Sequence, residues 1–245
     1  MLSNISLNKL INYLHLGELV KSWKECMSDN TGGFLIPVSV KLKDREFERY
    51  RHLPIDWSIS AITKEDLPSE FSSNAVKTVD MFRRKTVNLD VECMIYFDIQ
   101  TGNIVSCNFA DENIPNEVTG EIYPDFLEGM HIASLHNHPK HYCSPPSSKN
   151  FQMLSLDFEE YELILSEREL WILESKDIIF DEETINKIRE KTGGYLEIIF
   201  NDSNIQFENG YEVWDNVNKI YGDLLLIYFN KEFDNIKLIR RNLNG

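Results

Sequence analysis

Two histidines separated by one residue and followed at once by a proline are the strongest structural constraint in this chain. They end the run "HIASLHNHP" at residues 131–139, which predicts a strand that stops at Pro139 because proline cannot donate a ladder hydrogen bond. Alternate strand side chains share a face, so His136 and His138 point the same way, with Cα atoms about 6.5–7 Å apart. Both imidazoles can then bind one metal ion, although exposed or hydrogen-bonded histidines are the ordinary alternative for an isolated His-x-His pair.

The residues after the proline place a third candidate ligand near this pair. A loop over residues 140–146 leads to "SSKN", where Ser147 can cap a helix and Asn150 falls in its first turn. From there the Asn150 side chain can reach back toward the end of the strand. A catalytic zinc site has three protein ligands and one open position for water. The alternative is that Ser147 only caps the helix and Asn150 only contacts backbone groups.

The middle of the chain alternates between helical and strand patterns. The order helix, hairpin, strand, helix, hairpin predicts an α+β fold, an α/β sandwich of roughly a hundred residues. The capped helix is expected at residues 72–85, the first hairpin at 91–98 and 103–109, the second helix at 147–158, and the second hairpin at 161–166 and 170–175.

The flanking segments give weaker patterns. Residues 5–27 are expected to be helical, and "FLIPVSVKL" at Phe34–Leu42 is expected to form an edge strand because it contains Pro37. Residues 44–67 are expected to connect these elements. Near the end of the chain, residues 211–229 begin with a helical pattern, and their second half is compatible with either helix or strand.

Charge limits the kinds of partner that the chain can bind. The formal net charge is −15, spread along the sequence, which disfavours nucleic acid because that affinity depends on cations that contact phosphates. A local run at Arg83, Arg84 and Lys85 is expected to be a solvated helix end. A basic partner or a neutral protein or peptide substrate fits this surface better.

Several absences favour a cytoplasmic protein without a membrane anchor. The longest apolar run, Leu224–Phe229, is too short to cross a bilayer. The first residues lack the basic start and cleavage site of a secretory signal. The four cysteines have no paired spacing, as expected of reduced thiols.

The text "HNHP" followed by "PPSSKN" resembles the His-x-His-Pro and Ser-x-x-Asp signature of JAB/JAMM (MPN) metallopeptidases, and within them the RadC-like branch. The resemblance covers about residues 75–180. It implies a JAB/JAMM-like (cytidine-deaminase-like) core with a mixed sheet there. Residues 1–74 would then be an N-terminal helical/β extension and residues 181–245 a C-terminal α/β extension.

The resemblance also implies roles for individual residues. His136, His138 and the residue at position 150 would bind Zn²⁺, Ser147 would help to stabilise the oxyanion, and an upstream glutamate would be the general base. Glu92 lies 44 residues before His136, at the start of "VECMIYFD", and matches that glutamate. Its ordinary alternative is an exposed carboxylate, or one paired with a neighbouring arginine.

The match has one departure. Position 150 holds asparagine where the family has aspartate, after a loop one residue longer than the common spacing. An amide oxygen brings no negative charge, so we expect weaker zinc binding, or none. Asp157, Cys143 and His141 are conceivable substitutes.

Three functions follow from these patterns. The first is a zinc-dependent peptidase or isopeptidase of the JAB/JAMM type that hydrolyses an amide bond, with a protein or peptide substrate such as the C-terminal tail of a ubiquitin-like protein. The second is a catalytically degenerate JAMM-like binding or scaffold module. The third is a RadC-like protein that acts with DNA, and the net charge of −15 counts against it.

Overall fold

The structure is a computed structural model, and it describes the central part of the chain most completely. The described residues are 38–115, 117–118, 127, 129–139, 145–146, 150, 159–174, 183, 222–223, 225–227 and 237–243. By contacts the chain divides into two compact units, Met1–Lys41 and Leu42–Gly245. The sheet and the candidate site both belong to the second unit.

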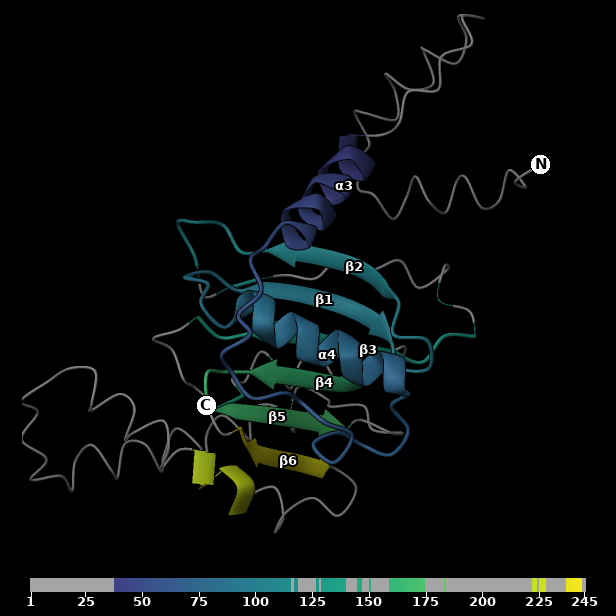
Figure 1. Cartoon of the computed structure of the whole chain (residues 1–245), viewed down its shortest axis with the longest axis vertical. Helices are drawn as coiled ribbons and strands as arrows, with labels where there is room; N and C mark the ends of the chain where they lie inside the picture. The colour runs from purple at the N-terminus through teal and green to yellow at the C-terminus, as the bar shows by residue number, and fades with distance from the viewer. Residues whose placement is uncertain are drawn as a thin grey trace, which may run out of the picture. The chain divides into compact units, whose positions relative to one another are not determined.

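A six-stranded mixed sheet forms the centre of the second unit, in the order β2-β1-β3-β4-β5-β6 (Figure 1). Neighbouring strands are antiparallel except β3 and β4, which are parallel. The predicted α+β fold is therefore confirmed. The elements are the helices α3 (Val38–Arg51) and α4 (Ser73–Thr86) and the strands β1 (Cys93–Asp98), β2 (Ile104–Phe109), β3 (Ile132–Asn137), β4 (Glu159–Leu165), β5 (Glu169–Glu174) and β6 (Lys237–Asn242).

Both hairpins and the helix before them form where the sequence predicts. Ser72 caps α4, because its Oγ accepts a hydrogen bond of 3.1 Å from the backbone N–H of Ala75. The turn between β1 and β2 contains Gly102 at φ 76°, a left-handed conformation that glycine adopts without strain. A Cβ at Gly102 would also lie 2.6 Å from the backbone of Asn74. This glycine therefore allows the turn to approach α4 closely.

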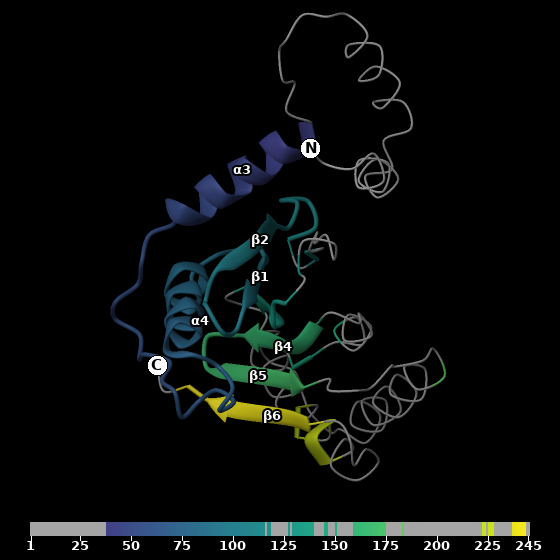
Figure 2. The ribbon, with the colours of Figure 1, turned by 90° about the vertical axis from the view of Figure 1, so that its right-hand side faces the viewer.

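Helix α4 covers one face of the sheet (Figure 2). Its Val79 and Phe82 are fully buried against residues of β1, β3 and β4. The strand residues of this core alternate with the residues that point to the other face, as the pleat requires. They are Cys93, Ile95, Phe97, Cys107, Ala133, Leu135, Tyr161, Leu163, Leu165, Leu170 and Ile172.

The expected strand at Phe34–Leu42 is wrong over its described part, because residues 38–42 begin helix α3. The edge-strand prediction was based on the strand-like run around Pro37. The charged sequence that follows, "KLKDREFERYR", consists mostly of good helix formers, and it extends the helix to Arg51. The first part of the expected connector at 44–67 is therefore also helical.

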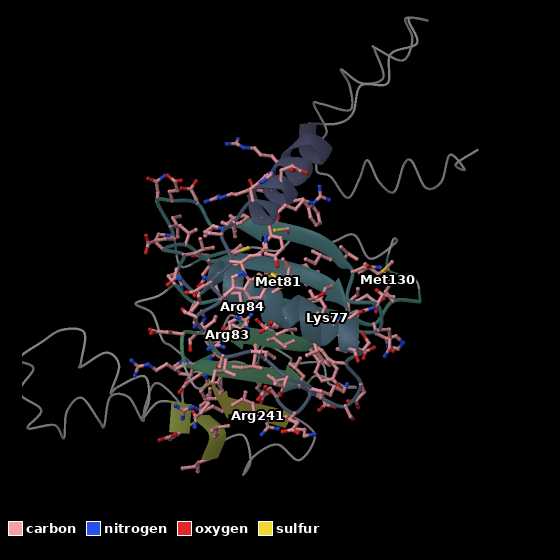
Figure 3. All side chains as sticks on the ribbon, viewed as in Figure 1. Lys77, Met81, Arg83, Arg84, Met130 and Arg241 are labelled. Carbon is pink, nitrogen blue, oxygen red and sulfur yellow. The ribbon has the colours of Figure 1, made fainter. Side chains whose placement is uncertain are left out.

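The basic run at the end of α4 is not the solvated helix end that we expected. Arg83 and Arg84 are 1% and 7% exposed, and Figure 3 labels both on α4. Arg83 donates hydrogen bonds to the carbonyl oxygens of Ser60 (2.6 Å) and Glu167 (3.1 Å). Arg84 pairs with Asp80 at 2.9 Å. These arginines tie the segment before α4 and the β4–β5 turn to the helix, so they are not available to a nucleic acid.

The sequence pattern did not predict β6. Its residues "KLIRRN" include three basic side chains and few apolar ones. Among the described strands β6 is at the end of the sheet and pairs with β5. The strand adds residues 237–242, from the expected C-terminal extension, to the same sheet as β1. The second half of the segment 211–229 is helical at its described residues 222–223 and 225–227.

The search for membrane-spanning helices covered the described residues only. Among them, no helix has both the length and the apolar composition needed to cross a bilayer.

Candidate functional site

The face of the sheet opposite α4 carries the histidine pair. Met94 and Tyr96 of β1 pair in register with His136 and Ser134 of β3, so their side chains share one face. Met94 and Tyr96 pack with Ile132 in a small apolar cluster that is separate from the core under α4. We call this face, with Met94, Tyr96, Ser134 and His136, the site face.

Glu92 lies on the same face. Its carboxylate Oε2 accepts a hydrogen bond of 3.2 Å from the backbone N–H of Val118, and Val118 packs against the Met94 cluster. The register that sets Met94 opposite His136 also sets Glu92 opposite His138 when it is extended by two residues. Glu92 is only 8% exposed. The predicted base and both predicted imidazole ligands therefore share one side of the sheet.

The two imidazoles lie close together and are buried. Their ring centroids are 5.3 Å apart, and His136 and His138 are 4% and 8% exposed. A 2.7 Å hydrogen bond from the backbone N–H of His138 to the carbonyl of Leu165 holds the chain at the end of β3. Burial lowers the pKa of His136 well below its usual range, and neighbouring His138 lowers it further. His136 is therefore neutral at pH 7, which is the form that binds a metal.

Asn150 meets this pair, as the sequence predicts, but it presents its amide nitrogen. Its Nδ2 lies 3.3 Å from His136 Nε2 and donates a 2.8 Å hydrogen bond to Glu162 Oε1. An amide binds a metal through its oxygen, since the NH₂ group is only a donor. The two imidazoles therefore fit zinc in their chemistry and placement. Asn150 fits it only with Oδ1 turned toward the rings.

Two acidic residues on β4 belong to the site and were missed from the sequence. Glu162 is 1% exposed, and its Oε1 lies 3.7 Å from His136 Nδ1. Glu159 is 3% exposed and accepts a hydrogen bond from Ser134 Oγ. Because β4 was interpreted only as half of a hairpin, its carboxylates received no role. For Glu162 the available signal was an acidic side chain between Tyr161 and Leu163, in the apolar second part of the strand.

Burial shifts both carboxyl groups toward their neutral forms. It raises the pKa of Glu159 to about 8, against two opposing hydrogen bonds from Ser134. It raises the pKa of Glu162 well above its usual range, and the neighbouring Glu159 raises it further. Burial and these two carboxyl groups also raise the pKa of Tyr96. A cation beside Glu162 would act in the opposite direction and favour its ionised form.

The other predicted site residue, Ser147, and the conceivable substitutes His141, Cys143 and Asp157 lie outside the described residues. Within the described part of the chain, no three His, Cys, Asp or Glu side chains are grouped so that they could hold a metal ion. The set predicted from the sequence contains two histidines and an asparagine.

A scan against models of known protein families, a search of curated proteins and a search of solved structures each found no match to this chain. The JAB/JAMM resemblance therefore depends on the motif residues alone.

Proposed function

We propose that the chain is a zinc-dependent peptidase or isopeptidase of the JAB/JAMM type. The observation that carries the proposal is the placement of the Glu92 carboxylate on the same face of the sheet as His136 and His138. A general base must be able to reach the water that it deprotonates, and the opposite placement would have excluded this role.

Each side chain has a defined part in this proposal. His136, His138 and Asn150, through Oδ1, would hold the zinc, which supplies Lewis acidity to a carbonyl and lowers the pKa of water. Glu92 accepts a proton from the attacking water and returns it to the leaving nitrogen as the amide C–N bond breaks. Ser147 is the proposed oxyanion donor. The substrate is a protein or peptide, for which the family resemblance suggests the C-terminal tail of a ubiquitin-like protein.

Metal content tests the first part of the proposal. The purified full chain, equilibrated with micromolar zinc and then desalted, should retain about one zinc per chain. His136→Ala should retain almost none, and His131→Ala is a matched control because His131 is exposed and pairs with Glu160. Absence of retained zinc in the wild-type chain would refute the enzyme proposal.

Glu92→Gln tests the second part. The variant should keep its zinc and lose hydrolysis of a panel of peptide and isopeptide substrates, because glutamine cannot accept the proton. Glu112→Gln, at an exposed acid just after β2, should behave as wild type. If Glu92→Gln loses its zinc as well, Glu92 is a ligand and not the base.

One observation favours a second function, a binding module without metal. In the structure the Asn150 amide donates to Glu162 Oε1 and lies against His136 Nε2, so Asn150 has a hydrogen-bond partner without an ion. For this function we expect no zinc at micromolar concentration, and the same thermal unfolding temperature with and without zinc. A third function, in DNA transactions, would require salt-sensitive retention on DNA, against a net charge of −15.

A further inference from the structure

Glu162 is a buried acid that neither the motif nor the proposed chemistry uses. It is 1% exposed on β4, where it pairs in register with Ser134 of β3. Its Oε1 accepts from Asn150 Nδ2 at 2.8 Å and lies 3.7 Å from His136 Nδ1. Its Oε2 is buried and has no hydrogen-bond partner among the described residues.

A buried carboxyl group in this position costs stability unless something compensates it. Carboxyl oxygens that lose water without gaining a hydrogen bond carry a desolvation penalty. An acid with one unsatisfied oxygen, beside a histidine and an asparagine, therefore indicates a ligand-dependent role.

We propose that Glu162 is the positioning residue of the zinc site and supplies the negative charge that Asn150 lacks. This inference rests on the proposed function. Carboxylates that contact the far nitrogen of a metal-binding histidine fix the orientation of its ring and raise its basicity. Glu162 is placed to do this through His136 Nδ1, which leaves Nε2 for the metal. It also holds Asn150, whose amide must turn its oxygen toward the same ion.

The role of Glu162 explains how a neutral ligand set can still hold a cation. Where the family signature has an aspartate that contacts the metal, this chain has the carboxyl group of Glu162 on the neighbouring strand. Glu162 contacts the proposed ligands His136 and Asn150 and not the metal itself. The carboxyl group lies among the same buried side chains, where electrostatic attraction is only weakly screened.

Glu162→Gln removes the charge and keeps an acceptor for Asn150. We expect its zinc affinity, measured by competition with a chromogenic chelator on the full chain, to fall about 10- to 100-fold. Glu160→Gln is the control, because Glu160 lies on the same strand and its Oε1 lies 2.6 Å from Nδ1 of His131, which is outside the proposed ligand set. We expect its zinc affinity to stay within about threefold of wild type.

A second pair of variants separates charge from structure. Asn150→Asp should tighten zinc binding both in the wild-type chain and in Glu162→Gln. The factor should be larger in Glu162→Gln, where the new aspartate restores the missing charge. A merely structural role for Glu162 would give equal factors in the two backgrounds. Equal factors, or a Glu162→Gln affinity equal to wild type, would overturn the inference.

The two proposals fail in different ways. If the wild-type chain binds no zinc, the proposed function fails and the role of Glu162 fails with it. If the wild-type chain binds zinc and Glu162→Gln binds it equally well, only the role of Glu162 fails. Thermal unfolding of each metal-free variant identifies any loss of fold. If Glu162→Gln does not fold, Glu162→Asp replaces it. That variant keeps the charge and should retain most of the zinc affinity.

Discussion

The two faces of the central sheet are built from the same strands and differ completely in what they bury. Under α4 the alternate residues of β1, β3 and β4 are apolar or aromatic and form one continuous core. On the site face the same strands bury His136, Ser134, Glu159 and Glu162 beside Tyr96. Both faces exclude water from these side chains, but the site face buries polar and ionisable groups beside its small apolar cluster of Met94, Tyr96 and Ile132.

This difference separates stability from function within one sheet. Burying apolar area contributes about 25 cal/mol per Å², whereas buried acids and imidazoles must be neutral or paired to be tolerated. The neutral forms favoured by the pKa shifts of His136, Glu159 and Glu162 are the expected consequence. We conclude that α4 and its core hold the sheet in place, and that the site face is maintained at a cost in stability.

The largest effect should come from the apolar face. Phe82→Ala removes a fully buried ring of α4 that stacks on Tyr50. We expect the free energy of unfolding to fall by about 3–5 kcal/mol, measured by urea denaturation. Lys77→Ala, at an exposed position of the same helix, should change it by about 0.5 kcal/mol or less. A small loss in Phe82→Ala would mean that this face is not the main source of stability.

A smaller effect of opposite sign should come from the site face. The pKa of Glu159 is about 8 in the folded chain and near 4.5 in the unfolded chain, so the folded state binds more protons between these values. Wild-type stability should therefore fall as the pH rises from about 4.5 to about 8. Glu159→Gln has no proton to lose there, so it should be more stable than wild type at pH 8 by up to a few kcal/mol. If the unfolding temperatures of wild type and Glu159→Gln change by the same amount over this pH range, the raised pKa of Glu159 is contradicted.

The smallest effect tests whether the two faces are independent. Ser72→Ala removes the cap of α4 and should cost about 1 kcal/mol in stability, measured by thermal unfolding. Ser73→Ala, at the exposed first helical residue, should cost less. Neither variant should change the zinc affinity of the site face. An altered affinity in Ser72→Ala would show that the helix on one face controls the site on the other.

Local patterns predicted much of the fold. Alternating apolar residues and turn residues placed both hairpins, β3 and the capped helix α4 within a few residues of their observed bounds. The patterns failed where local signals conflict or are weak. The segment at 38–42 combines strand-like residues with a helical continuation, and the charged β6 resembles a surface segment.

The candidate site was half predicted. Strand periodicity was enough to predict His136 and His138 on one face. The expected helix start predicted Asn150 near them, and Asn150 does lie against His136. Pairing between distant strands cannot be read from periodicity, so the face of Glu92 and the approach of β4 stayed open until the sheet order was known. Glu162 was missed for this reason, because its neighbours lie on other elements.

The sequence by itself determined which residues alternate, where strands and helices begin, and that two imidazoles share a side. These properties depend on the local geometry of the backbone, which a few neighbouring residues set. Only the tertiary structure decided that Glu162 and Asn150 contact His136 and that Glu92 shares its face of the sheet. It also decided that Arg83 and Arg84 are buried under the segment before α4. Such contacts join residues far apart in the chain, and the register of the sheet and the packing of α4 bring them together.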